Sequence, residues 1–166
     1  MHSLVMTVIG PDRPGLVEEL STIVASHRGN WLESRMSHLA GHFAGLLRVE
    51  CPEEESRHLL ETLRGLDDLS VVVSEEIMAK SEWPRRISFD VVGNDRPGIV
   101  QELSSAIARA GANVEELVSN LESAPHAGHP VFRATGSVAV TADFEDGMLM
   151  TALESLGPDL AVSLDE

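Results

Sequence analysis

The run Leu4–Ile9 is mostly apolar and places Leu4, Met6 and Val8 on one face at a period of two, and Ile87, Phe89 and Val91 repeat this spacing, which is that of a strand. The residues that follow the first run, Pro14–Arg28, carry apolar side chains at helical spacing instead. The second run is followed by the same helical pattern, displaced by 83 positions. A strand that leads into a helix is therefore predicted twice in this chain.

The remaining pattern completes the same unit twice. After the first helix, Gly29 stands where a C-terminal glycine is expected, and two strand-like runs, the second of them alternating, surround Ala40-Gly41, which predicts a hairpin. A leucine-bearing helix opening at Glu53 and a last short strand follow. The predicted later elements are Asn30–His38, His42–Glu50, a helix from Glu53 to Leu66 and Leu69–Val73, then, after the second turn and helix, Val131–Thr141, Phe144–Leu156 and Leu160–Leu164.

The order βαββαβ predicts an α+β fold of two ferredoxin-like units, each a four-stranded antiparallel sheet with two helices on one face. We expect the units to span 1–79 and 80–166, with 77–84 as the connector. The spacing between matching residues changes from 83 to 90 late in the second copy. The turn-rich segment 123–130 is the natural place for these seven extra residues.

The turn between the first strand and the first helix is the motif most relevant to binding. Gly10-Pro11-Asp12-Arg13-Pro14-Gly15-Leu16 recurs as Gly93-Asn94-Asp95-Arg96-Pro97-Gly98-Ile99. Each proline suits a first helical position, and each aspartate is a candidate to cap the first turn. Because Gly15 and Gly98 lack a Cβ, a ligand can approach the backbone closely. Free amides at a helix start favour a carboxylate, so an anionic ligand group is predicted here.

Two further residue pairs have a binding and a structural interpretation. The amide oxygens of Asn30 and Asn113 can accept a hydrogen bond from a ligand ammonium, although asparagine after a helix also suits the left-handed region. Arg13 and Arg96 can pair with a ligand carboxylate or with a nearby acidic side chain. The sequence leaves both choices open.

Charge and composition exclude several classes of function. The net charge is −15, and both halves share it, so free nucleic acid is repelled and control of a gene would require a protein partner. Cys51 is the only cysteine, which excludes an internal disulfide and fits a reducing compartment. Neither a signal peptide nor a membrane-spanning run is recognised. We therefore expect a cytoplasmic protein that binds neither nucleic acid nor membrane.

With this element order and the duplicated glycine turn, the sequence resembles the ACT domain, a small-molecule regulatory module. The form of its turns is similar to the ACT branch that includes regulators of glycine cleavage. The resemblance implies a free amino acid, with glycine as first candidate, bound where two ACT units meet. The residues that it implies are the turn positions Asp12, Arg13, Pro14, Gly15 and Leu16, their counterparts Asp95, Arg96, Pro97, Gly98 and Ile99, and the second-strand positions Asn30 and Asn113.

The resemblance also implies a non-catalytic protein that controls a transcription activator of the glycine cleavage system by direct contact. An alternative is a dissociable regulatory subunit of an amino-acid biosynthetic enzyme, and formation of a homo-oligomer is open. A small enzyme that uses His126 and His129 is the third hypothesis, although no acidic or cysteine partner stands at ligand spacing. We expect neither a metal nor a cofactor.

Overall fold

The computed structural model describes residues 1–75, 83–123, 128 and 130–165. The chain divides into two compact units, Met1–Ala79 and Lys80–Glu166. Most of the segment expected to connect them, 77–84, lies outside the described residues. Each unit is considered by itself below.

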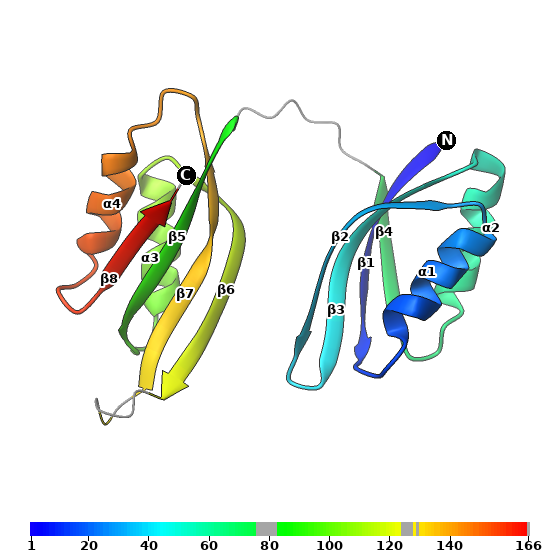
Figure 1. Ribbon diagram of the computed structural model, residues 1–166, viewed down its shortest axis with the longest axis horizontal. Coiled ribbons are helices and arrows are strands. Elements are labelled where there is room, and N and C mark those ends of the chain that lie inside the picture. The colour runs from blue at the N-terminus through cyan, green and yellow to red at the C-terminus, as the bar shows by residue number, and fades with distance from the viewer. Residues whose placement is uncertain (76–82, 124–127, 129, 166) are drawn as a thin grey trace. The chain divides into compact units, whose positions relative to one another are not determined.

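The first unit has the order βαββαβ, and its four strands form one antiparallel sheet in the order β2-β3-β1-β4. Both of its helices lie on one face of that sheet (Figure 1). This confirms the predicted fold. The elements are β1 His2–Pro11, α1 Leu16–Ser26, β2 Asn30–Leu39, β3 His42–Cys51, α2 Glu53–Arg64 and β4 Ser70–Glu75.

The second unit repeats this arrangement, with sheet order β6-β7-β5-β8 and both helices again on one face (Figure 1). Both second strands carry a β-bulge at the same place in the repeat, between Trp31 and Glu33 and between Val114 and Glu116. The elements are β5 Arg85–Asn94, α3 Ile99–Arg109, β6 Asn113–Ser123, β7 Pro130–Val140, α4 Asp146–Glu154 and β8 Ala161–Asp165.

A separate aliphatic core holds each unit together. In β1, residues at alternate positions point to the helices and are buried, whereas those between them point to the opposite face. The helices contribute one apolar stripe each, as their spacing predicts. The first core centres on Leu4, Met6, Val8, Leu20, Leu47 and Leu59, and the second on Ile87, Phe89, Val91, Leu103, Ile107 and Leu149.

The seven extra residues of the second unit do not all lie in the hairpin. Val49 pairs with Leu4 and Val138 with Ile87, so the third strands match at an offset of 89. Since Leu59 and Leu149 match at 90, the seventh residue lies between β7 and α4. The other six fall between Glu122 and Val131, which pair as Leu39 and His42 do in the first unit. Within that span, 124–127 and 129 lie outside the described residues.

Candidate functional site

Each glycine turn is a tight turn that ends in a left-handed glycine. Gly15 has φ 84° and ψ 2°, and Gly98 has φ 88° and ψ 1°. With proline directly before it, this is the geometry of a type II turn. The glycine is also the N-cap residue, because the Glu19 amide donates to the Gly15 carbonyl at 2.9 Å and the Glu102 amide to the Gly98 carbonyl at 2.9 Å. Only glycine adopts this conformation without strain.

This geometry corrects two predictions about the turn. Pro14 and Pro97 are not the first helical residues, because α1 begins at Leu16 and α3 at Ile99. Asp12 and Asp95 do not cap the helices, since neither N-cap receives a side-chain hydrogen bond. The left-handed glycine occupies the cap position itself, which leaves the aspartates too far back along the chain.

The two aspartates instead connect the turns to the hairpins through their backbone. The Asp12 amide donates to the Gly41 carbonyl at 2.9 Å, and the Asp95 amide to the Pro130 carbonyl at 3.5 Å. In α1, the amides of Leu16–Glu18 precede the first intrahelical bond and point out of the helix start. The Ile99 amide of α3 donates to the Arg96 carbonyl at 3.2 Å. Each turn therefore presents amides beside the end of a hairpin.

Both turn arginines pair with acidic side chains of their own unit. Arg13 donates to Asp68 and to Glu19, and these carboxylates raise the pKa of its guanidinium. Arg96 donates to Glu102 at 2.6 Å and to the Leu156 carbonyl at 3.1 Å. These contacts hold each turn against its first helix and against the loop that precedes its last strand. A role for either arginine in holding a ligand carboxylate stays a prediction.

The pairing of Asp68 with Arg13 makes the first unit sensitive to acid. The hydrogen bond from Arg13 lowers the pKa of Asp68 below its ordinary value of 3.8. A carboxyl group with a lowered pKa stabilises the folded state above its unfolded pKa, and this contribution disappears as pH falls through the folded value. We expect the melting temperature of Asp68→Asn to lie below that of the wild type above about pH 5 and to approach it below pH 3.8.

Thermal melts of the full chain between pH 2.5 and 7 measure this effect. The matched control is the same substitution in an Arg13→Gln background, where Asp68 has lost its hydrogen-bond donor. There the change should have little effect at any pH. An Asp68→Asn penalty that is equally large in both backgrounds would contradict the role assigned to the pair.

The turn of the second unit borders a hollow of about 480 Å³. Its walls come from the turn, the start of α3 and the facing strands of the hairpin. They combine the backbone of the turn with one carboxylate, one guanidinium, one hydroxyl, one carboxamide and several apolar side chains. The lining residues are Asp95, Arg96, Gly98, Ile99, Val100, Ser119, Asn120, Leu121 and Phe132.

The corresponding walls of the first unit have different side chains. At the offset of 83, Met36 and His38 stand where the second unit has Ser119 and Leu121. The imidazole Nε2 of His38 lies 3.7 Å from the carboxylate of Asp12. A long thioether and an imidazole therefore replace a small hydroxyl and an apolar side chain beside the first turn. The walls beside the two turns therefore differ in their chemistry.

The asparagines lie far from the turn of their own unit. Asn30 pairs with Glu50 at the level of Ser3 on β1, whereas the turn begins after Pro11. Eight residues of strand separate these two levels, which is roughly 26 Å. Asn113 is likewise level with the first residues of β5. Within one unit, the asparagine and the glycine turn cannot bind the same small ligand.

The structural interpretation of the asparagines, as left-handed residues after a helix, was wrong. The left-handed residues after the helices are Arg28, with φ 55°, and Gly111, with φ 86°. The asparagines stand two residues later, at the first positions of β2 and β6. Gly29 is needed for space, because a Cβ there would lie 2.8 Å from the Val24 carbonyl oxygen. The Asn30 side chain donates to Glu50 at 3.4 Å.

Sequence reasoning missed the hairpin wall of the hollow. Ser119, Asn120 and Leu121 belong to the far end of β6, and Phe132 belongs to β7. The available signal was strand length, because an eleven-residue strand that starts just after the end of α3 must reach the turn at its other end.

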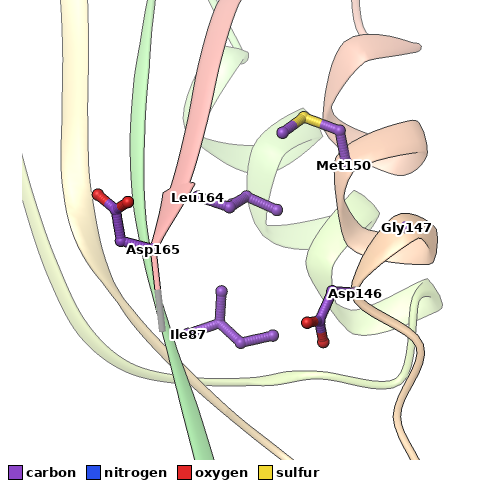
Figure 2. Close-up of a pocket in the computed structure, with 6 residues that line it drawn as sticks. All are labelled: Ile87, Asp146, Gly147, Met150, Leu164 and Asp165. Carbon is purple, nitrogen blue, oxygen red and sulfur yellow. The ribbon is translucent and has the colours of Figure 1, made fainter.

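A second hollow, of about 270 Å³, lies between α4 and the second sheet. Figure 2 shows Ile87 and Leu164 pointing from the sheet toward α4, with Met150 on the facing side and the Asp165 carboxylate turned away. Asp146 at its edge accepts hydrogen bonds from Arg85 at 3.0 and 3.2 Å. This hollow is mainly a gap in helix packing, beside a carboxylate that is already paired.

Other candidate groups add no reactive centre to the described part of the chain. Cys51 is buried in the first core, and burial raises the pKa of its thiol, which disfavours the reactive thiolate. Across the described residues, no three His, Cys, Asp or Glu side chains gather closely enough to hold a metal ion. The loop residues His126 and His129 lie outside the described residues.

Comparison with known proteins agrees with this architecture. A family model of the ACT domain matches residues 2–73. The glycine cleavage system transcriptional repressor of Escherichia coli (strain K12) is 27% identical over 127 residues, which cover 74% of this chain and 67% of that protein. The protein of the same name from Shigella flexneri matches equally well.

Solved structures extend the similarity to both units. A protein of unknown function from Galdieria sulphuraria has a TM-score of 0.83 and 26% identity, and the match covers 99% of this chain and 98% of that one. A candidate glycine cleavage system transcriptional repressor has a TM-score of 0.69 and 20% identity over 99% and 96% of the two chains, which supports the fold alone. Among the described helices, none is long and apolar enough to cross a membrane. The family model of the ACT domain thus matches residues 2–73 of the first unit, the second unit repeats its sheet topology, and the chain is similar to the glycine cleavage system transcriptional repressor.

Proposed function

We propose that this protein is a non-catalytic regulator that binds a small amino acid beside the Gly98 turn and passes the signal to a protein partner. The observation that carries the proposal is the hollow at that turn, which has polar groups at the helix start and an apolar wall from the hairpin. The ACT family match and the similarity to a repressor support regulation over catalysis.

The groups around the hollow suit the two charged ends of an amino acid. Amides at the start of α3 favour a carboxylate, and the Asp95 carboxylate favours an ammonium group. Ser119 and Asn120 add further polar atoms at the rim. The remaining wall includes Leu121 and Phe132, which suit an apolar ligand side chain.

Glycine remains a candidate ligand because the curated relatives regulate glycine cleavage. It has no side chain, however, and would leave the exposed side chains of this wall, Val100 and Leu121, uncovered. Leucine, valine or phenylalanine would bury that wall, and each buried apolar square ångström contributes about 25 cal/mol. The geometry therefore favours an apolar amino acid over glycine at this site.

The signal would reach the partner by differential binding. A ligand that binds one conformation of the turn and hairpin more tightly than another shifts the population toward it, and so changes the surface offered to the partner. By analogy with the repressor, the partner is a transcription activator of the glycine cleavage system, and the site of action is the cytoplasm. The charge of −15 disfavours direct contact with nucleic acid.

Titration calorimetry of the full chain against glycine, leucine, valine and phenylalanine tests the proposal. We expect heat with at least one of them and a stoichiometry near one per chain, since the first unit has a different wall. Leu121→Ala should weaken binding about fivefold to tenfold by removing part of the apolar wall. Leu39→Ala, at the exposed tip of the first hairpin, is the matched control and should bind as the wild type.

Two outcomes would count against this site. If none of the four amino acids released or absorbed heat on titration, the proposed binding of an amino acid would be contradicted. If Leu121→Ala and the wild type bound the amino acid equally tightly, the ligand would not bind in this hollow.

A further inference from the structure

The two helices of the second unit leave a groove between them. They pack side by side on one face of the second sheet (Figure 1). A hollow of about 420 Å³ lies between the end of α3, at Ala106 and Ala110, and the facing side of α4, at Met148 and Ala152. We call this hollow the α3–α4 groove. Its volume falls within the range of small-molecule pockets, which is about 300–1,000 Å³.

The first unit fills the same groove with its own side chains. Ala110 stands at the position of His27, and each is the C-cap residue of its helix. At the offset of 90, Ala152 stands at the position of Thr62. In the first unit, the imidazole Nε2 of His27 lies 3.0 Å from the Thr62 hydroxyl, so these two side chains bridge the helices. In the second unit both members of the pair are alanines, and the α3–α4 groove lies between them.

The α3–α4 groove combines apolar walls with one positive charge. Met148 is 50% exposed, so an apolar ligand would cover a large apolar side chain that is now half in water. Arg109 also lines the groove. It forms no hydrogen bond or ion pair within the part of the chain that the structure describes. Its guanidinium is therefore available to a carboxylate.

The polar groups of the α3–α4 groove favour an anion over an amino acid. None of its described lining residues is acidic, so the groove offers no carboxylate to a ligand ammonium. The Thr151 hydroxyl can donate to a ligand oxygen. The hollow beside the Gly98 turn differs, because the Asp95 carboxylate lines it.

We propose that the α3–α4 groove binds a small monocarboxylate whose apolar body is about the size of one aromatic ring. The ring would occupy the space that corresponds to His27 of the first unit, and the carboxylate would pair with Arg109. This site is separate from the hollow beside the Gly98 turn. Ile99 and Arg109 are the first and last residues of α3, which puts the two sites at opposite ends of a helix roughly 15 Å long.

Nuclear magnetic resonance titration of the isotope-labelled full chain with phenylacetate tests the proposal, and phenethyl alcohol is its uncharged counterpart. We expect phenylacetate to bind in the low millimolar range, as suits so small a ligand, with the largest shifts at the amides of Ala110 and Ala152. It should bind about threefold to fivefold more tightly than the alcohol, because an exposed ion pair adds only a modest attraction. Arg109→Ser, which installs the residue found at Ser26 of the first unit, should remove this difference and leave the affinity for the alcohol unchanged.

A second variant fills the groove. Ala110→His combined with Ala152→Thr installs the bridging pair of the first unit and should weaken binding of both ligands at least about tenfold, because the added side chains take the ligand's space. Arg64→Ser is the matched control for the charge, since Arg64 is also an exposed arginine in the last turn of a helix but belongs to the first unit. It should bind both ligands as the wild type does.

Three results would overturn the proposal. The first is an absence of shifts around the α3–α4 groove at roughly 20 mM phenylacetate, or shifts that are largest beside the Gly98 turn. The second is equal affinity of the wild type for phenylacetate and for the alcohol. The third is a filled variant that keeps the wild-type circular dichroism and still binds phenylacetate as tightly as the wild type. If the filled variant does not fold, the comparison of Arg109→Ser with Arg64→Ser decides.

Discussion

Gly136→Ala is expected to unfold the second unit at much lower denaturant concentration, with a loss of about 3 kcal/mol in the free energy of unfolding. Gly136 lies on β7 and pairs with Phe89 and with Leu117. A Cβ at this position would lie 2.0 Å from the Glu116 carbonyl oxygen and 2.9 Å from the Phe89 ring. Because the closest atom belongs to the backbone of β6, rotation of a side chain cannot relieve the clash.

The same chemical change at Gly147 is the matched control and should have the opposite sign. Gly147 lies in α4 of the same unit, and a Cβ there would meet no atom within 4 Å. Alanine favours a helix over glycine by about 0.8–1.0 kcal/mol, so Gly147→Ala should stabilise the second unit slightly.

Urea unfolding followed by far-ultraviolet circular dichroism measures both variants, with the wild type as reference. If the two units unfold separately, Gly136→Ala should lower the urea midpoint of the transition that belongs to the second unit and leave the other transition unchanged. If they unfold together, it should lower their single shared midpoint. A Gly136→Ala midpoint equal to that of the wild type would show that β6 moves aside without cost, contrary to the packing described above.

Gly136 also shows which features of the repeated unit could be predicted from the sequence and which could not. In the first unit, Met6 pairs with Leu47, and at the same place in the second unit Phe89 pairs with Gly136. A larger ring opposite a glycine replaces two side chains of similar size. The alternation of apolar residues predicted that both strands face a core. It did not predict at which positions a larger side chain on one strand is matched by a smaller residue on the neighbouring strand, because that depends on pairing between strands far apart in sequence.

The glycine turn was found from sequence, whereas its local geometry was interpreted wrongly. The duplicated Asp-Arg-Pro-Gly motif placed a strand-to-helix turn correctly at Gly15 and Gly98. The prediction that the aspartates cap the helices was wrong because a left-handed glycine serves as the N-cap residue instead. The sequence of the motif alone does not reveal the φ angle of this glycine. The length of the second strand puts Asn30 at the end of the sheet opposite to the turn of its own unit, so a ligand shared by an asparagine and a turn between two units stays a prediction.

Gly98→Val is expected to lower both the stability of the second unit and its affinity for an amino acid. Gly98 has φ 88°, a region that is strained for any β-branched residue, so the substitution should cost about 2 kcal/mol in the free energy of unfolding. No atom lies within 4 Å of the added Cβ, so the stability loss comes from backbone strain and not from a clash. The new methyl groups would extend beside the hollow that Gly98 lines, which should weaken binding at least about tenfold.

Gly111→Val separates strain from binding. Gly111 has φ 86°, and a Cβ there also meets no atom within 4 Å, but it lies after the end of α3 and does not line the hollow. Both variants should therefore lose similar stability in urea, while only Gly98→Val loses affinity in calorimetry with the amino acid that the wild type binds. If both bound that ligand as tightly as the wild type, the ligand would have to lie elsewhere on the protein. If both lost affinity equally, the effect would come from strain in the unit and not from the position of Gly98 in the wall.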